Sequence, residues 1–305
     1  MLISAESREF DYLILGGSGF LGSNFVNQFA KEYSVCATYN NSDQVDNSEI
    51  HWIHFDAQNF SNLLNILNTI KPKIIINCIA LANVEACEKT PILATKLNQE
   101  LPGFIAKVCN NLKILFVHIS TDHFNSKDQI PRTEKESMTG INQYGKTKFL
   151  GEQEILKVNS SALIIRTNFF GWGNQSHNSL LNWIIDSLSS GSIIQGYEDV
   201  FFTPISTREL IRCANELVYA KAKGIVNISG NTTISKYEFV KLVALKFGYN
   251  TNQISKAKSS VVAGKTRRPY FLGLNNSLLC SILGRKIMDL DSMIEELRND
   301  RISKI

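Results

Sequence analysis

"GGSGFLGSNF", residues 16–25, directly follows the apolar run "FDYLIL" at residues 10–15 and opens a stretch with helical periodicity. Gly16, Gly19 and Gly22 have the spacing G-x-x-G-x-x-G. In such a turn the first glycine lets a strand bend into a helix, the second lets backbone approach a pyrophosphate, and the third lets the helix pack on the sheet. The free N–H groups of the helix start would bind phosphate. A purely structural turn can carry the same glycines, so the dinucleotide interpretation depends on the surrounding pattern.

Short apolar runs alternate with longer amphipathic ones over the first 170 residues. The apolar runs are 10–15, 34–39, 51–55, 73–80, 113–119 and 162–167, and the amphipathic ones lie near 20–32, 60–70, 91–110 and 142–158. This alternation predicts an α/β fold with a Rossmann-like, doubly wound parallel sheet covered on both faces. After residue 170 the alternation weakens. We therefore expect an NAD(P)-binding domain over residues 1–170, completed by segments near 203–230, and a smaller C-terminal substrate-binding lobe that takes up most of residues 171–305.

Composition narrows the classes of protein. The 305 residues are 44% hydrophobic with a net charge of +4, and no basic block indicates nucleic acid. The first ten residues lack the apolar core expected of a signal peptide, and the longest nearly apolar run, residues 74–84, is too short to span a membrane. The six cysteines are scattered without a Cys-x-x-Cys pair, which favours reduced thiols in a cytoplasmic protein over a disulfide framework. The histidines form no ligand cluster, so we expect no metal site.

The end of the second predicted strand bears on the choice of cofactor. An acidic residue there would bind the ribose 2′-hydroxyl of NAD and repel the 2′-phosphate of NADP. This chain has Thr38, Tyr39 and Asn40 followed by Asn41 and Ser42, with Asp43 arriving late. NADP(H) is therefore the preferred cofactor and NAD(H) an alternative, although no arginine is present to clamp the phosphate. Asp56, after the third strand, either accepts a hydrogen bond from adenine or is only a turn residue.

A tyrosine and a lysine in "QYGKTK" predict proton-transfer chemistry. Tyr144 and Lys148 are four residues apart and share one helical face. A lysine cation one turn away would lower the pKa of the tyrosine toward neutrality. Thr121 follows the apolar run 113–119, so its hydroxyl should lie where open α/β sheets bind ligands. These residues predict a catalytic trio, whereas the simpler interpretation of Thr121 is a turn cap.

With these motifs in order, the chain resembles the extended branch of the short-chain dehydrogenase/reductase superfamily, and within it dTDP-4-dehydrorhamnose reductase and other nucleotide-sugar-modifying enzymes. The stretches that carry the resemblance are "LILGGSGFLGSNF", "KPKIIINCIA", "STDH", "YGKTKFLGE", "IIRTNFFGWG", "FFTPISTREL", "GIVNISGNTTISKYEF" and "RRPYFLGLN". Together they cover nearly the whole length. One departure is His123, where the rhamnose reductases usually carry tyrosine, and it leaves the identity of the sugar open.

The resemblance implies roles for individual residues. The catalytic trio would be Thr121, Tyr144 and Lys148, the last two also touching the cofactor. Further cofactor contacts would be Gly16, Gly19, Phe20, Leu21, Gly22, Asn40, Asp56, Ala57, Ala80, Leu81 and Ala82. Substrate contacts would be His123, Asn168, Phe169 and Trp172. From the residues alone, His123 either contacts the substrate or is a structural polar residue. Arg268 is likewise either a diphosphate clamp or a surface ion pair. Arg166 is expected to be a buried structural partner, and Trp172 and Trp183 are expected to be packing residues, with base-stacking platforms as the alternative.

The predicted function is NADPH-dependent reduction of a keto group on a nucleotide-linked deoxysugar. One alternative is a nucleotide-sugar epimerase or dehydratase that recycles NAD(P) internally. Another is a cofactor-binding regulatory subunit like that of methionine adenosyltransferase. The expected partner is the nucleotide sugar, with neither nucleic acid nor membrane involved, and the resemblance favours a homodimer.

Overall fold

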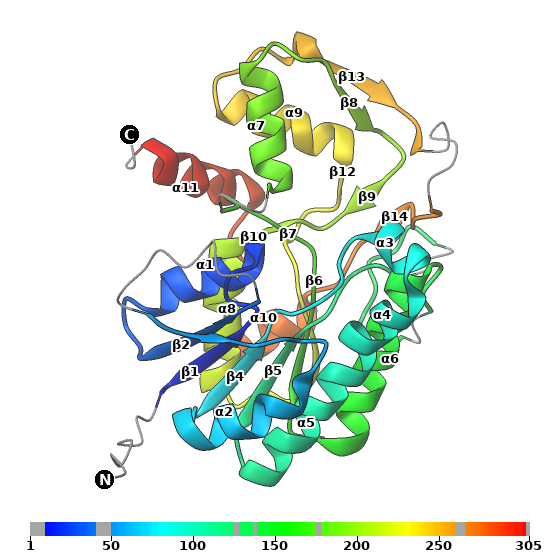
Figure 1. The fold of residues 1–305 in the computed structure, drawn as a ribbon. Coiled ribbons are helices and arrows are strands. Elements are labelled where there is room, and N and C mark those ends of the chain that lie inside the picture. The colour runs from blue at the N-terminus through cyan, green and yellow to red at the C-terminus, as the bar shows by residue number, and fades with distance from the viewer. Residues whose placement is uncertain are drawn as a thin grey trace.

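The central feature of the fold is a sheet of seven strands, shown in Figure 1. The computed structural model describes residues 10–40, 50–124, 128–136, 139–174, 178–259 and 266–302. In spatial order the strands are β3 (His51–His54), β2 (Val35–Tyr39), β1 (Tyr12–Leu15), β4 (Ile74–Asn77), β5 (Leu115–Ile119), β6 (Leu163–Thr167) and β11 (Gly224–Ile228). Every neighbouring pair is parallel, so the predicted doubly wound sheet is confirmed.

The order of strands reverses between β1 and β4. The chain builds outward from β1 through β2 to β3 and then returns to the other side of β1 with β4. The connections at the carboxyl ends of β1 and β4 therefore run to opposite faces and leave a crevice, which is the place where open α/β sheets bind ligands. The glycine turn at residues 16–22 lies at this point.

Helices cover both faces of the sheet because its strands are apolar on both sides. Tyr12 and Ile14 of β1 belong to one core, and Leu13 and Leu15 belong to the other. The first core is covered by α1 (Phe20–Phe29), α8 (Thr207–Tyr219) and α10 (Ser277–Leu283). The second is covered by α2 (Leu63–Ile70), α5 (Leu101–Leu112) and α6 (Gln143–Val158). Short helical elements complete the connections between strands and helices. Between β3 and α2 lies η2 (Phe60–Asn62), and between β4 and α5 lie α3 (Val84–Lys89), α4 (Pro91–Thr95) and η3 (Lys96–Glu100).

A smaller lobe lies above the carboxyl ends of the strands (Figure 1). Its helices are α7 (Leu180–Ser189), α9 (Lys236–Lys246) and α11 (Leu290–Ile302), and α9 contacts both of the others. Its short strands are β7 (Phe169–Phe170), β8 (Ile194–Tyr197), β9 (Phe201–Phe202), β10 (Ile205–Ser206), β12 (Ile234–Ser235), β13 (Ile254–Ala257) and β14 (Phe271–Leu272), with the turn η4 (Thr251–Gln253) before β13.

The chain enters this lobe three times. It leaves the sheet after β6, forms β7 to β10, and returns as α8 and β11 beside β6. It then forms β12, α9, β13 and β14, returns to the sheet as α10, and ends in the lobe with α11. The segment 203–230, which we expect to complete the cofactor domain, thus supplies the last strand of the sheet.

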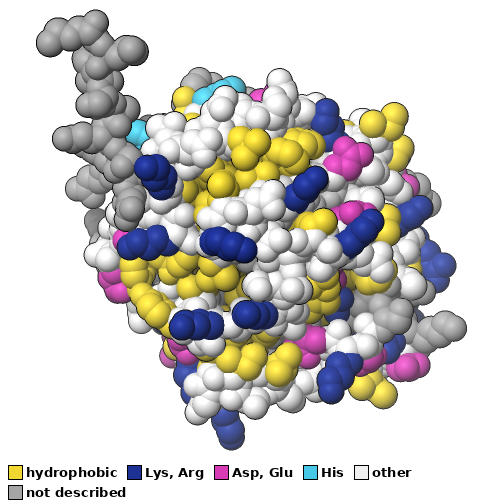
Figure 2. All heavy atoms as spheres, turned by 90° about the horizontal axis from the view of Figure 1, so that it is seen from below, with side chains coloured by type: hydrophobic (Ala, Val, Ile, Leu, Met, Phe, Trp, Pro, Cys, Tyr) yellow, Lys and Arg dark blue, Asp and Glu magenta, His cyan; other side chains and the backbone are white. Residues whose placement is uncertain are grey.

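Figure 2 shows the face of the molecule opposite the lobe. Lysine and arginine side chains stand singly there between uncharged and apolar groups, with acidic side chains among them. None of the helices in the described ranges is long and apolar enough to cross a membrane. None of the six cysteines is in a disulfide, and four of them are buried.

Candidate active site

The glycine turn has the geometry that a pyrophosphate needs. Gly16 has a φ of +76°, and its N–H donates to the Thr38 hydroxyl over 2.9 Å. A Cβ on Gly22 would lie 2.0 Å from the Gly16 carbonyl oxygen, so only glycine fits there. Gly19 is the N-cap of α1, where no side chain caps the helix start, and a Cβ on it would meet only the Gly16 oxygen, at 3.3 Å. The N–H groups at this helix start can therefore hold phosphate oxygens.

The other predicted cofactor residues lie along the carboxyl edge of the sheet. Leu21 is buried in the core, so only its backbone could meet a ligand, whereas the ring of Phe20 contacts Phe169 with centroids 5.4 Å apart. Asn40 is exposed at the end of β2, and Asn41 to Asp43 lie outside the described residues.

Asp56 is exposed after β3, and its carboxylate accepts a hydrogen bond from the Gln58 N–H at 2.8 Å. This contact makes Asp56 a turn residue. Its role toward adenine, like that of the half-buried Ala57 beside it, stays a prediction.

Asn98 is a residue of this region that the sequence did not reveal. It is buried in η3, and its side chain makes two hydrogen bonds to the backbone of Leu81, of 2.9 and 3.1 Å. It thereby positions the segment Ala80–Ala82 beside the crevice. A polar residue in an amphipathic helix gave no signal of this contact.

Tyr144 and Thr121 lie together on one wall of a cavity between the sheet and the lobe. Tyr144 lies in the first turn of α6, whose start is capped by the Asn142 side chain accepting from the Gly145 N–H at 2.9 Å. Thr121 follows β5 and lies beside Tyr144. Burial raises the pKa of Tyr144 to about 12, and the nearby Thr121 hydroxyl opposes that rise only in part. The phenol is therefore protonated near neutral pH and suited to donate a proton.

Lys148 lies one helical turn after Tyr144 but points toward the sheet. Its Nζ donates to the Ile119 carbonyl at 2.7 Å and lies 3.1 Å from Nε2 of His118. Burial lowers the pKa of Lys148 to about 8, against the opposing charges of Glu152 and Cys78. The expectation that Lys148 lowers the pKa of Tyr144 is wrong for this structure, because burial dominates and the phenol's pKa rises.

A buried ion pair holds α6 against the sheet. Arg166 of β6 donates three hydrogen bonds of 2.7–3.1 Å to the Glu152 carboxylate, and the Ser120 hydroxyl donates a fourth. Both charged side chains are buried, so Arg166 is the structural partner that the sequence predicted. Since Ser120 immediately precedes Thr121, this network also positions the end of β5 that carries Thr121.

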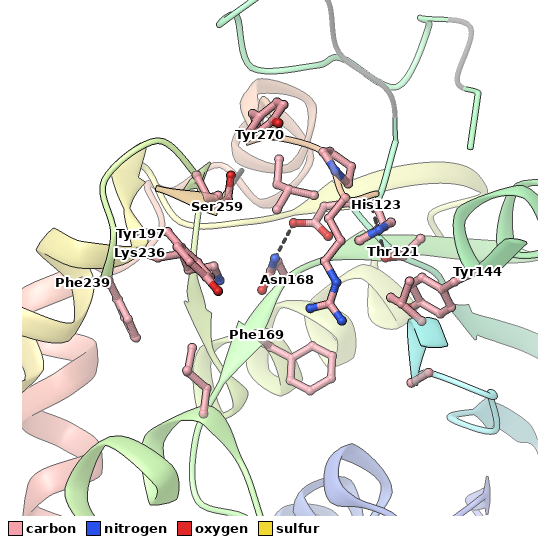
Figure 3. Close-up of a pocket in the computed structure, with 18 of the residues that line it drawn as sticks. Thr121, His123, Tyr144, Asn168, Phe169, Tyr197, Lys236, Phe239, Ser259 and Tyr270 are labelled. Atoms are coloured by element: carbon pink, nitrogen blue, oxygen red, sulfur yellow. Dashed lines mark hydrogen bonds between the residues drawn. The ribbon is translucent and has the colours of Figure 1, made fainter. Parts of the chain in front are cut away.

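The wall of Tyr144 belongs to a cavity of about 690 Å³ between the sheet and the lobe. In Figure 3, Thr121, His123 and Tyr144 lie on one side of it, and Tyr197, Lys236 and Phe239 lie on the other. Asn168 and Phe169 lie between the two groups. The glycine turn is not part of this lining, which reaches toward the crevice through Ala82.

His123 stands beside the proposed proton donor. Its ring is 5.4 Å from the Tyr144 ring in an edge-on arrangement, and its Nε2 is 2.7 Å from the Asn142 amide nitrogen. Burial, helped by the charge of Arg268, lowers the pKa of His123 to about 4. His123 is therefore neutral at physiological pH and can offer a hydrogen bond to a ligand but no charge.

Two ionisable residues of the cavity were missing from the sequence prediction. Asn168 donates a hydrogen bond to Asp122, whose pKa is raised by burial. Lys236, whose Nζ lies 3.3 Å from the centre of the Phe202 ring, has a pKa lowered by burial and partly restored by Asp122. Asp122 directly follows Thr121 in "STDH", so its place near the site could have been predicted from the sequence. Lys236 comes from the lobe, more than a hundred residues further along the chain, and could not.

The two tryptophans lie in different surroundings. Trp172 is not part of the cavity lining; its indole donates to the Leu297 carbonyl at 2.7 Å and its ring packs beside Phe247. The ring packs as the residues alone predict, and the substrate role implied by the resemblance stays a prediction. Trp183 lines the cavity and is 43% exposed, so its assignment to packing also stays a prediction.

Arg268 also lines the cavity, and it pairs with Glu85 at 2.7 Å. The surface ion pair foreseen for it is present, and a role toward diphosphate stays a prediction. Within the described ranges, no cluster of three or more His, Cys, Asp and Glu side chains could hold a metal ion.

Comparison with protein families agrees with this geometry. The model described as "RmlD substrate binding domain" matches residues 11–300. The chain belongs to this family. The match spans both the sheet and the lobe, so the family covers the glycine turn, the Tyr144 wall and the cavity together.

Curated relatives in this family have more than one function. "Probable low-salt glycan biosynthesis reductase Agl14" of Haloferax volcanii is 26% identical over 259 residues, covering 83% of this chain and 85% of that protein. The dTDP-4-dehydrorhamnose reductase of Escherichia coli is 27% identical over 233 residues, covering 72% and 77%. The bovine "Methionine adenosyltransferase 2 subunit beta" is 23% identical over 273 residues, covering 84% and 77%.

Solved structures show the same fold. A dTDP-4-dehydrorhamnose reductase from Bacillus anthracis in complex with NADP has a TM-score of 0.81 at 21% identity, covering 96% of this chain and 99% of that one. A dTDP-glucose 4,6-dehydratase from the same organism in complex with NAD has a TM-score of 0.78 at 16% identity, covering 97% of each chain. Neighbours with this fold are thus seen with either cofactor.

Proposed function

We propose that this protein reduces a keto group on a nucleotide-linked deoxysugar with NADPH. The observation that carries the proposal is that Thr121 and Tyr144 lie side by side on the wall of a large cavity, in a fold whose strand order and glycine turn suit a dinucleotide. Two curated relatives are named as reductases, which supports the same reaction class.

The residues of the wall suit the reduction of a carbonyl. NADPH, when bound, supplies the hydride that adds to the carbonyl carbon. Tyr144 donates the proton that the oxygen then requires, and Thr121 holds that oxygen by a hydrogen bond. Lys148 lies one helical turn further along α6, and its ammonium would attract the negative charge that Tyr144 acquires on giving up the proton, although in the pKa of the phenol this attraction does not outweigh burial. The C=O bond thus gains one hydride and one proton and becomes an alcohol.

The preference for NADP rests on the residues at the end of β2 and directly after it. No carboxylate is present from Thr38 to Ser42, so nothing there repels a 2′-phosphate. The reductase from Bacillus anthracis, which shares the fold, is seen with NADP. We propose NADP(H) as the working cofactor, with NAD(H) accepted more weakly.

The substrate proposal rests on the size and charge of the cavity. A volume of about 690 Å³ can accommodate a nucleotide sugar, and Arg267 and Arg268 at its rim can meet a diphosphate. His123, Asn168 and Phe169 line the region nearest Tyr144 and would contact the sugar. The alcohol product would leave by the same rim.

Replacing Tyr144 tests the proposal. With dTDP-4-dehydrorhamnose as the probe, Tyr144→Phe should lower kcat by roughly a hundredfold or more, because the proton donor is lost. Cofactor affinity, measured by fluorescence titration with NADPH, should stay similar. Tyr249→Phe, which removes a hydroxyl bonded to Ser189 in the lobe, is the matched control and should keep full activity. Full activity in Tyr144→Phe would remove this residue from the mechanism.

A specific observation favours one alternative, a nucleotide-sugar epimerase or dehydratase. Such reactions need an additional acid or base, and Asp122 and Lys236 in the cavity have pKa values shifted toward neutrality. Those enzymes return the hydride to their own substrate. Steady loss of NADPH absorbance indicates net reduction, whereas product formation without loss of NADPH indicates internal recycling.

The similarity to the methionine adenosyltransferase subunit supports a third candidate, a regulatory subunit that binds cofactor. It predicts no turnover across a panel of nucleotide-sugar ketones and co-purification with a partner enzyme. The Thr121–Tyr144 pair on an open cavity favours the reductase over it.

A further inference from the structure

Behind the catalytic wall, three buried polar side chains form a chain that the proposed mechanism does not use. Asn77 of β4 and His118 of β5 are paired residues of adjacent strands, and both are completely buried. The Asn77 amide nitrogen lies 3.1 Å from Nδ1 of His118, and Nε2 of His118 lies 3.1 Å from Nζ of Lys148. These contacts link two strands of the sheet to the helix that carries Tyr144.

The direction of these hydrogen bonds follows from the backbone. The Asn77 carbonyl oxygen accepts from the Ile79 N–H at 3.1 Å, so the amide N–H₂ must face His118. Nδ1 of His118 therefore accepts. Burial, helped by the charge of Lys148, holds the pKa of His118 well below its usual range, so the ring is neutral. A neutral imidazole whose Nδ1 accepts carries its hydrogen on Nε2.

This hydrogen points at Lys148. An ammonium offers only donors, whereas an amine has one lone pair that can accept from Nε2–H. The contact is therefore a hydrogen bond only when Lys148 is neutral, and it opposes the ammonium form. Glu152 on α6 and Cys78 after β4 act in the opposite direction, and Arg166 of β6 engages Glu152. The Ile119 carbonyl accepts from Lys148 in either form.

We propose that His118, with its tautomer set by Asn77, is a positioning residue that holds Lys148 at the end of β5 and makes it less basic. The catalytic consequence rests on the proposed function. An ammonium is needed when Tyr144 gives up its proton, so His118 would set the pH above which reduction fails. It acts through Lys148 and touches neither substrate nor cofactor.

The first test needs no variant and no turnover. In protein labelled with ¹⁵N-histidine, the ring nitrogen shifts of His118 should show a neutral Nε2–H tautomer from about pH 5 to pH 9. The His118→Phe spectrum assigns the signals. A hydrogen on Nδ1, or a charged ring in this range, would overturn the inference.

The second test asks whether the tautomer controls the lysine. Asn77→Asp places an acceptor opposite Nδ1, which should draw the hydrogen there and let Nε2 accept from the ammonium. The pKa of Lys148, followed by the shift of its ¹³Cε, should then rise by about one unit or more. In the His118→Phe background the same Asn77→Asp change should move that pKa by less than half as much. Equal shifts in both backgrounds would mean that the new carboxylate acts through space, and the inference would fail.

The two proposals can fail separately. If the protein reduces no nucleotide-sugar ketone, the titration of Lys148 still decides the role of His118. If the titration behaves as expected but the alkaline limb of kcat/KM for reduction does not move with it, then Lys148 has no part in the reductase mechanism and its control by His118 stands.

Discussion

The buried pair of Glu152 and Arg166 offers the sharpest prediction about stability. Their side chains are 1% and 2% exposed, and Arg166 gives Glu152 three hydrogen bonds. Glu152→Gln keeps the shape but leaves a guanidinium charge buried without its counter-charge. A broken buried pair typically costs about 3–5 kcal/mol, so we expect a loss in this range in the free energy of unfolding.

Removing both charges should cost much less. In Glu152→Leu/Arg166→Met neither charge remains to be desolvated, and the apolar pair fills a similar volume, so the loss should stay within about 1–2 kcal/mol. Urea unfolding followed by circular dichroism measures both variants. Lys246→Gln, which breaks contacts of an exposed lysine with Asp291 and Glu295, is the control and should lie within the error of the measurement.

Two results would refute this reasoning. One is a loss below about 1 kcal/mol for Glu152→Gln, which would mean that the charge pair is solvated or relaxes easily. The other is a double variant as unstable as the single one, which would mean that packing, and not an uncompensated charge, carries the stability.

Three further predictions concern the turn, a helix end and pH. Gly22→Ala must displace the Gly16 carbonyl, so it should lower the free energy of unfolding by about 2 kcal/mol and also weaken NADPH binding. Gly19→Ala should keep the urea unfolding midpoint and weaken only NADPH binding, measured by fluorescence titration. Lys113→Gly should raise stability by about 1 kcal/mol in urea unfolding, because Lys113 has a φ of +59° after α5; no gain would contradict the strain. Because burial lowers the pKa of Lys148 from 10.5 to about 8, its ammonium is lost as the pH rises through about 8, and kcat/KM for reduction should fall above that value. The residual activity of Lys148→Met should not show this fall in kcat/KM above about pH 8.

The parts of the site that the sequence predicted are those defined by local chemistry. Gly16, Gly19 and Gly22 were predictable because a strand-to-helix turn with that spacing has few other uses. Tyr144 and Thr121 were predictable because each lies at the start or end of an element whose type could be read from its periodicity. In both cases the signal lies in the residue type and its place at a strand or helix end, although the partners, such as Thr38 for Gly16, lie further along the chain.

The parts that escaped depend on partners far away in the chain. Trp172 was assigned to the sugar, yet its indole partner is the Leu297 carbonyl in the last helix. Lys236 comes from the second excursion of the chain into the lobe, and no pattern in "ISKYEF" shows that it meets Asp122. The sequence also did not predict where the Lys148 side chain points. Its Nζ contacts two residues of β5, His118 and Ile119, and not Tyr144.

The path of the chain through β11 has a consequence for how such proteins diversify. The last strand of the sheet, β11, lies in the chain between two segments that both line the cavity, one before it and one after it. A new ligand preference must therefore arise by coordinated changes in the segments on both sides of this strand. Grafting either segment alone from a relative should yield a chimaera whose cavity no longer closes around one molecule.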